Sequence, residues 1–205
     1  MELSKVTMIL RGYTYEEIRC VAEVLITCNS RYIRNMEITL NTDNAISIIK
    51  DIVKEFGNYL NIGAGTVQTY DELVQAIDAG AKFVLSPRTM SKEMLDYCKE
   101  KHVISIPGSF TPSEIGNSFD NGANIVKVFP ANELSLSYAA KVREPMGDYE
   151  LMAVGGINKT NVKEALTSGY QYVGTAGGLF SKENIKSKNK EKLIEELKEF
   201  EKAID

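Results

Sequence analysis

Short apolar runs alternate with longer amphipathic stretches along the whole chain. The short runs are rich in Val, Ile, Tyr or Phe and close on Gly, Pro or a small polar residue, which is typical of β-strands. The strands predicted in this way are 6–11, 32–40, 59–65, 82–87, 103–109, 125–130, 150–156 and 170–177. The helical spacing of apolar residues and the cap signals between them predict helices over 14–28, 41–56, 69–80, 111–119, 158–169 and 182–205.

About eight strand–helix units follow one another, and no Pro/Ser-rich linker divides them. Such alternation predicts a parallel sheet covered by helices, and eight units are the number that closes a (β/α)8 TIM barrel of about 200 residues. We therefore expect residues 1–205 to form one α/β domain, a TIM barrel. The alternative is a doubly wound open sheet, which favours fewer strands and a glycine fingerprint where this chain has LRGYTYEE.

The composition excludes several classes of function. The chain has 205 residues, a net charge of −4 and a pI near 5.3, which give no reason to expect nucleic acid or a membrane surface as a partner. We expect neither a membrane helix nor a secretory signal. Three cysteines without metal-ligand spacing indicate free thiols in a reducing compartment, so we expect a cytoplasmic protein without metal or cofactor.

Two predicted strands carry a charge on the side that should face the barrel interior. In NMEITLN (35–41) the apolar residues at even positions suit the helix layer, which turns Glu37 and Asn41 inward. In IVKVFP (125–130) the two valines suit the helix layer, which turns Lys127 and Phe129 inward. The pattern therefore predicts opposite charges, Glu37 and Lys127, inside one barrel.

Buried charges are costly unless they are paired or used. One interpretation is a structural Lys–Glu ion pair, or a lysine that reaches water along its own stem. The other interpretation is catalytic. Desolvation lowers the pKa of a lysine, the free amine can attack a carbonyl carbon, and a nearby carboxylate can move protons. Both interpretations remain open on these residues alone.

Glycines and small polar residues follow other predicted strands. The segments are GAGTV (63–67), LSPR (85–88), PGSFTP (107–112), VGGIN (154–158) and GTAGG (174–178). The carboxyl ends of barrel strands meet at one mouth, and backbone N–H groups of glycine loops can approach an anion closely there. The last two segments therefore predict a phosphate cradle.

Seven ordered segments resemble one known family, the 2-keto-3-deoxy-6-phosphogluconate / 4-hydroxy-2-oxoglutarate (KDPG/KHG) aldolases. They are ILRG (9–12), EITLNT (37–42), GAGTV (63–67), LSP (85–87), PGSFTPSE (107–114), VKVFPA (126–131) and VGGI (154–157). The resemblance runs from about residue 6 to residue 180. It implies a class I aldolase: a barrel, usually trimeric, that needs no metal and works through a Schiff base.

The resemblance also implies a role for each matching position. Lys127 becomes the Schiff-base lysine, and Glu37 becomes the general acid and base. The implied substrate-binding residues are Arg11, Asn41, Thr66, Pro87 and Phe129 around the keto acid, with Gly155, Gly156, Gly177 and Gly178 near the phosphate, where Ala176 belongs to the same loop.

Three positions depart from the gluconate-type motifs, because Asn41 stands for an arginine, Val154 for a threonine and Gly177 for a serine. The first two resemble the variant that acts on 2-keto-3-deoxy-6-phosphogalactonate. We expect a homotrimer that cleaves a phosphogluconate-type or phosphogalactonate-type keto acid to pyruvate and glyceraldehyde 3-phosphate. The alternatives are cleavage of 4-hydroxy-2-oxoglutarate to pyruvate and glyoxylate, and a sugar-phosphate-binding barrel without turnover.

Overall fold

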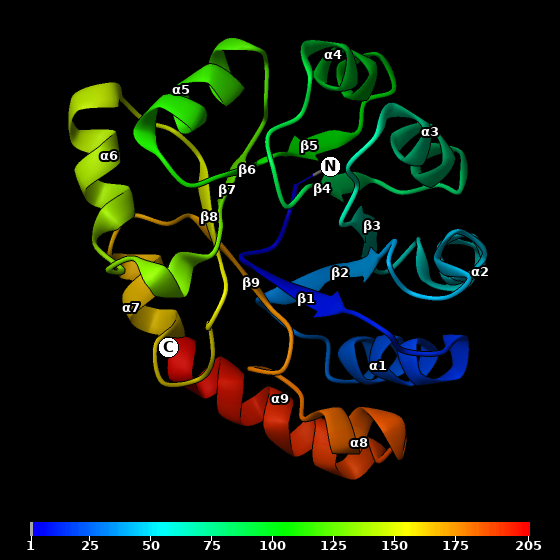
Figure 1. Ribbon diagram of the computed structural model, residues 1–205. Coiled ribbons are helices and arrows are strands. Elements are labelled where there is room, and N and C mark those ends of the chain that lie inside the picture. The colour runs from blue at the N-terminus through cyan, green and yellow to red at the C-terminus, as the bar shows by residue number, and fades with distance from the viewer. Residues whose placement is uncertain (1) are drawn as a thin grey trace.

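The computed structural model describes residues 2–205 and contains a ring of parallel strands inside a ring of helices (Figure 1). The strands are β1 (Val6–Leu10), β2 (Ile33–Thr39), β3 (Asn61–Gly65), β4 (Phe83–Leu85), β5 (Ile104–Ile106), β6 (Gly108–Ser109), β7 (Val126–Val128), β8 (Leu151–Val154) and β9 (Tyr172–Thr175). The helices are α1 (Tyr15–Thr27), α2 (Ala45–Phe56), α3 (Tyr70–Asp78), α4 (Lys92–Glu100), α5 (Pro112–Asp120), α6 (Tyr138–Met146), α7 (Val162–Thr167), α8 (Lys182–Lys186) and α9 (Lys190–Ile204), with a 3₁₀ turn η1 (Ala131–Glu133).

The sheet closes into a barrel where β5 and β6 together take the place of the fifth strand of a (β/α)8 barrel. In the strand order β5–β4–β3–β2–β1–β9–β8–β7–β6, the two end strands are separated in sequence by Pro107 alone. Proline has no N–H to give to the ladder, so β5 pairs with β4 while β6 pairs with β7. The N–H of Lys127 donates to the carbonyl of Pro107 at 2.9 Å and joins the two ends. The predicted (β/α)8 TIM barrel is confirmed, and the doubly wound alternative is wrong.

Side chains of the strands alternate between two apolar layers. Met36, Ile38, Val126 and Val128 belong to the large core between the sheet and the helices, as their positions predict. A smaller core fills the barrel itself, with Ile125 among its residues. The alternation places Glu37 and Lys127 on the inner side of the sheet, because each has helix-facing neighbours before and after it.

Three of the helices begin with a complete capping box. Thr14, Thr69 and Thr111 each accept a hydrogen bond from the N–H three residues on, and the glutamate there accepts one from the threonine N–H. At Thr111 the local sequence TPSE (111–114) is typical of such a helix start, with Pro112 in the first turn. A cap of this kind contributes about 1 kcal/mol, which fixes where each loop ends.

The last predicted helical stretch, 182–205, is two helices. The chain leaves α8 at Lys186, and Lys188 has a φ of +53°, a left-handed conformation that ends a helix. Asn189 then caps α9, which buries Leu193, Leu197 and Phe200. Helices α4 and α6 also form, in two stretches where the hydrophobic pattern predicts no helix. Among residues 2–205, none of the helices is long and apolar enough to cross a membrane.

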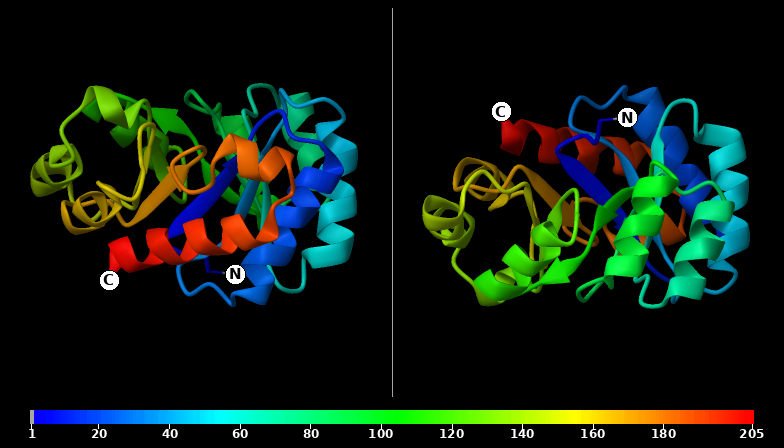
Figure 2. Two further views of the ribbon diagram at one scale, coloured as in Figure 1. Left: turned by 90° about the horizontal axis from the view of Figure 1, so that it is seen from below. Right: turned by 90° about the horizontal axis from the view of Figure 1, so that it is seen from above.

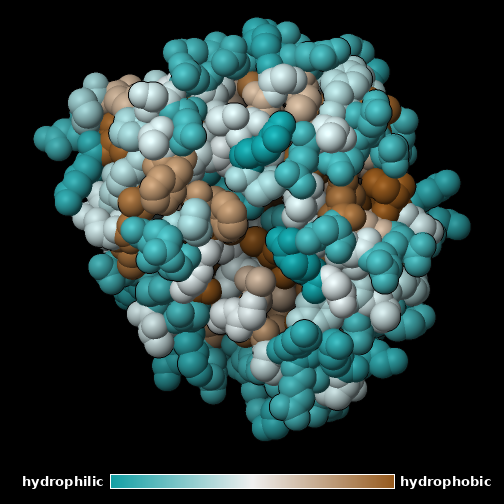
Figure 3. Space-filling view, viewed as in Figure 1, coloured by the Kyte–Doolittle hydropathy of each residue, from teal (hydrophilic) through white to brown (hydrophobic). Residues whose placement is uncertain are grey.

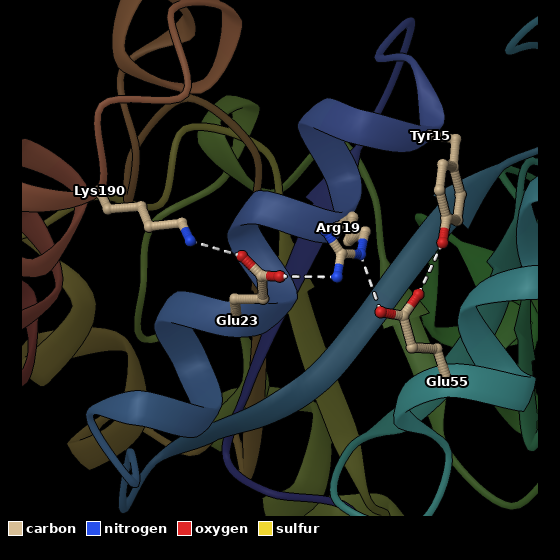
Figure 4. A network of polar contacts seen from close by, with 5 residues as sticks. All are labelled: Tyr15, Arg19, Glu23, Glu55 and Lys190. Atoms are coloured by element: carbon tan, nitrogen blue, oxygen red, sulfur yellow. Dashed lines mark hydrogen bonds and ion pairs between the residues drawn. The ribbon is translucent and has the colours of Figure 1, made fainter.

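A network of paired charges lies on the outside of α1, α2 and α9. Arg19 on α1 contacts Glu55 on α2 at 2.8 Å and Glu23 at 3.1 Å, and Glu23 also contacts Lys190 of α9 at 2.7 Å (Figure 4). Tyr15 donates to Glu55 at 2.6 Å. Exposed pairs of this kind contribute less than about 1 kcal/mol each. The network ties the helices on either side of α1 together at the surface.

Candidate active site

The loops that follow the strands gather at one end of the barrel, and the start of β1 and the C-terminus lie at the other end (Figure 2). Figure 1 looks onto the loop end, and the space-filling view from the same side is hollowed near its centre (Figure 3). A cavity of about 440 Å³ opens here, lined by residues of β1, β2, β7, β8 and β9 and of the loops that follow them. Eight of the predicted site residues line it: Arg11, Glu37, Lys127, Phe129, Gly155, Gly156, Gly177 and Gly178.

Lys127 lies in the middle of β7 with 5% of its surface exposed. Its Nζ is 4.6 Å from the centroid of the Phe129 ring. Burial lowers the pKa of Lys127, Arg11 lowers it further, and Glu37 acts in the opposite direction. Within residues 2–205, Lys127 has no ion pair within 4.0 Å, so its side chain is available to a ligand in the cavity.

Glu37 lies on β2 with 1% of its surface exposed. Its Oε2 atom is buried and has no hydrogen-bond partner in the described chain. Burial raises the pKa of Glu37, while Lys127 and Arg11 act to lower it. The structure therefore does not contain the direct Lys–Glu ion pair that was one interpretation of the sequence. It holds two unpaired groups whose neutral forms, an amine and a carboxylic acid, are both favoured by burial.

Gly65 at the end of β3 makes the position of Glu37 possible. A Cβ atom built on Gly65 would lie 1.6 Å from Oε1 of Glu37 and 2.3 Å from its carboxyl carbon. Any side chain at this position would push the carboxyl group out of its place. The sequence pattern treats the glycines of GAGTV as donors at a strand end, and this steric role could not be predicted because it depends on a contact between two strands.

The loops after β8 and β9 present backbone donors to the cavity. Gly155 and Gly156 have φ values of +113° and +70°, which favour glycine. In the described chain, the N–H groups of Gly156, Gly177 and Gly178 donate to no other protein atom. Gly178 is confined, because a Cβ there would lie 2.0 Å from the carbonyl oxygen of Ile157. These unsatisfied donors can bind the oxygens of an anion.

Three predicted site residues lie outside the lining of this cavity. Thr66 and Pro87 are half-buried just after β3 and β4, and Thr66 has a φ of +59°. Asn41 is exposed after β2, and its side-chain oxygen accepts a hydrogen bond of 3.0 Å from Arg11. The cavity also has polar lining residues that were not predicted, Asn158 at the end of VGGIN and Thr175 just before the glycine loop 176–178.

A larger depression, of about 650 Å³, lies between the loops after β1 and β2. Its charged residues are Asp43 and Asp51, both exposed, and it contains no lysine. Carbonyl chemistry needs the amine of Lys127, so the smaller cavity is the candidate active site. In the part of the chain that the structure describes, no group of three His, Cys, Asp or Glu residues could hold a metal ion.

A desolvated lysine and a buried acid at the loop end of a (β/α)8 barrel define a site of the Schiff-base type. Residues 1–196 match the protein family described as KDPG and KHG aldolase. The chain belongs to this family, and so to the carbon–carbon lyases, as the sequence predicts.

Three relatives illustrate the match. A probable 2-dehydro-3-deoxy-6-phosphogalactonate aldolase of Rhizobium meliloti (strain 1021) is 32% identical over 173 residues, 84% of this chain and 80% of that protein. The KHG/KDPG aldolase of Escherichia coli (strain K12) is 32% identical over 135 residues, 65% of this chain and 62% of that protein. The structure of a KDPG aldolase from Legionella pneumophila, with pyruvate captured as a covalent carbinolamine, aligns with a TM-score of 0.81 and 28% identity over 95% of this chain and 92% of that one.

Proposed function

We propose that the protein is a class I aldolase that cleaves a 2-keto-3-deoxy-6-phospho sugar acid to pyruvate and glyceraldehyde 3-phosphate. The observation that carries this proposal is that Lys127 and Glu37 line one cavity, each buried and each without a direct ionic partner. Family membership supports the same reaction.

The first half of the reaction uses the amine of Lys127. Its nitrogen attacks the C2 keto carbon and forms a carbinolamine, which loses water to give an iminium ion. Burial favours the free amine, because it lowers the pKa of Lys127. Glu37 can donate the proton that the departing water needs, because its raised pKa favours the protonated carboxyl.

The second half uses the conjugate base of Glu37. The carboxylate takes the proton of the C4 hydroxyl, the C3–C4 bond breaks, and its electron pair moves into the iminium ion to give an enamine. Glyceraldehyde 3-phosphate leaves as the aldehyde product. The protonated Glu37 returns a proton to C3 of the enamine, and water then hydrolyses the resulting iminium ion, which releases pyruvate and restores the free amine. No further co-reactant is required.

The phosphate end of the substrate fits the glycine loops. The free N–H groups of Gly156, Gly177 and Gly178 lie on the β8 and β9 side of the cavity, and Lys127 enters it from β7. The Rhizobium meliloti relative, which covers 84% of this chain, carries the name of a phosphogalactonate aldolase, and this supports the galactonate-type substrate first. The gluconate-type substrate is the second to test.

An unphosphorylated substrate, 4-hydroxy-2-oxoglutarate, is the second candidate. Gly177 supports it, because this residue offers no side-chain hydroxyl to a phosphate. Comparing kcat/KM for the two phosphorylated substrates and for 4-hydroxy-2-oxoglutarate separates the candidates. A phosphate cradle in use should favour a phosphorylated substrate by about 10²-fold or more. The alternative of a barrel without turnover is not favoured, since both groups of the Schiff-base route line the cavity.

Reductive trapping tests the mechanism. The protein is incubated with pyruvate and borohydride, digested, and the modified peptide is identified by mass spectrometry. We expect the adduct on Lys127 and on no other lysine. An adduct on a different lysine, or none at all, would remove the proposed mechanism.

We also propose a homotrimer in the cytoplasm. Phe110, which is 39% exposed in the loop after β6, supports self-association, because a large exposed ring is favourable at an interface. The free cysteines Cys20, Cys28 and Cys98 support a reducing compartment. Light scattering should give three times the 22.8 kDa of one chain, and a monomer would contradict the assembly.

A further inference from the structure

Arg11 reaches the cavity from the end of β1 and is held there by a neutral partner. Its Nη1 donates to the side-chain oxygen of Asn41 at 3.0 Å, across the gap between the ends of β1 and β2. Arg11 lines the cavity, whereas Asn41 does not. Asn41 therefore contacts the guanidinium of Arg11 but not the cavity itself.

The backbone around Arg11 is held by two more residues of the EITLNT segment. The N–H of Gly12 donates to the hydroxyl of Thr42 at 2.9 Å, and the hydroxyls of Thr42 and Thr39 are 3.1 Å apart. The hydroxyl of Thr39 lies 3.4 Å from the carbonyl of Leu10 and donates to it. This chain of hydrogen bonds fixes the segment 10–12 on both sides of Arg11, and both threonines are buried.

The partner of the guanidinium carries no charge. Among residues 2–205, Arg11 has no carboxylate within 4.0 Å, so its positive charge is not neutralised by an ion pair. A guanidinium has five N–H donors, and the bond to Asn41 uses one of them. The remaining donors are free for a carboxylate or phosphate oxygen of a ligand.

We propose that Asn41 is a positioning residue, which holds the Arg11 guanidinium at the mouth of the cavity as an unneutralised cation facing the anionic substrate. This inference rests on the proposed function. It reassigns Asn41, which the sequence predicts to bind substrate directly. Arg11 makes the contact, and Asn41 restricts the freedom of a long side chain before the substrate arrives.

The position of Arg11 also matters for the amine. The charged groups that face Lys127 are Glu37 from β2 and Arg11 from the end of β1. A cation held near Lys127 disfavours its ammonium form. If Asn41 is removed and Arg11 swings toward solvent, the acidic limb of the kcat/KM profile should move to higher pH, because the amine then stays protonated longer.

A double-mutant cycle tests the proposal, with turnover of the phosphorylated keto acids as the readout. Asn41→Ala should raise KM about tenfold with a smaller change in kcat, because a hydrogen bond to a charged group is lost. Asn41→Asp should raise KM at least as much, because its carboxylate pairs with Arg11. In an Arg11→Ala background, Asn41→Ala should have no further effect. Asn117→Ala on the exposed face of α5 is the matched control and should behave as wild type.

Three results would overturn the proposal: an unchanged KM and acidic limb in Asn41→Ala, an effect of Asn41→Ala that persists in full without Arg11, or an Asn41→Asp variant as active as wild type. Borohydride trapping with pyruvate separates this failure from failure of the proposed function. If wild type traps no pyruvate, both fall. If wild type traps pyruvate at Lys127 and Asn41→Ala leaves KM and the acidic limb unchanged, only the role of Asn41 falls.

Discussion

Two polar side chains on the same face of β2 have opposite surroundings. Asn35 lies near the start of β2, at the end of the barrel opposite the loops, which we call the closed end. It is fully buried, donates to the carbonyl of Ser4 at 2.8 Å, and accepts a hydrogen bond from Asn61 at 2.9 Å. Glu37, two residues further along, is as deeply buried, yet its Oε2 has no partner. Buried polar groups are costly unless satisfied, so the first is explained by stability and the second by a ligand that supplies what the protein does not.

The largest effect should come from Lys127, the second unpaired group. Lys127→Met keeps the length of the side chain and removes the nucleophile, so kcat should fall by about 10⁴-fold or more. The variant should unfold at the same or higher denaturant concentration, because a desolvated amine no longer has to be buried. Turnover and urea unfolding measure the two effects. A variant that is inactive because it is unfolded would contradict this separation.

Glu37→Gln keeps the shape of the carboxyl group and removes its ability to exchange a proton. We expect kcat to fall by about 10²- to 10⁴-fold, while trapping of pyruvate at Lys127 persists at a reduced rate. Stopped-flow measurement of product release and mass spectrometry of the adduct check the two parts. Full activity in this variant would assign the proton transfer to another group.

Gly65→Ala should displace the carboxyl group of Glu37 while leaving the glutamate itself in the sequence. The added Cβ would lie 1.6 Å from Oε1, so the carboxyl group must move, and kcat should fall by about 10²-fold. Gly116→Ala in α5 is the matched control, because its Cβ would meet only the flexible end of Met146 at 3.0 Å. The control should keep its activity. Equal losses in both variants would indicate a general effect on folding.

Asn35→Ala at the closed end should do the reverse of the site variants: it should lower stability and leave turnover nearly unchanged. It leaves Ser4 and Asn61 without their partner, so the free energy of unfolding should fall by about 1–3 kcal/mol. The kcat value at a temperature well below unfolding should stay within about twofold of wild type, since Asn35 does not line the cavity. A stable variant that has lost turnover would contradict the division between the two ends.

The smallest effect concerns the pH dependence of stability. The pKa of Glu37 is raised above 4.5 in the folded chain, so the folded state keeps a proton that the unfolded state has lost. Stability from this source is fully present below pH 4.5 and is lost as the pH rises through the raised pKa. As the pH rises from 4.5, the free energy of unfolding of wild type should therefore fall relative to that of Glu37→Gln. A difference independent of pH would contradict the raised pKa.

Much of the barrel follows from local patterns. Every strand forms where short apolar runs predict one, and the even–odd alternation around Glu37 and Lys127 gives their inward direction correctly. The break at Pro107 divides one predicted strand in two without changing the topology. Helix α4 buries only Met94, Leu95 and Cys98 in a mostly polar segment, and α6 contains Pro145, which explains why neither stands out in the sequence.

Strand alternation predicts the inward direction of Glu37 and Lys127, but the other six predicted lining residues lie in loops and are identified by their resemblance to the family's motifs. Residues within β2 and β7 point where the alternation requires, whereas Asn41, Thr66 and Pro87 lie in loops, where alternation no longer applies. The support of Arg11 by Asn41 and the space that Gly65 leaves for Glu37 are contacts between different strands. No spacing within one segment indicates them.

A crystal structure after soaking with pyruvate tests the account most directly. We predict continuous density between Nζ of Lys127 and C2 of pyruvate, with the Glu37 carboxyl group within hydrogen-bond distance of the oxygen that leaves. The closed end of the barrel around Asn35 should remain unchanged. Pyruvate bound without a covalent link, or linked to a lysine outside this cavity, would contradict the assignment of Lys127 and Glu37 as the reacting pair.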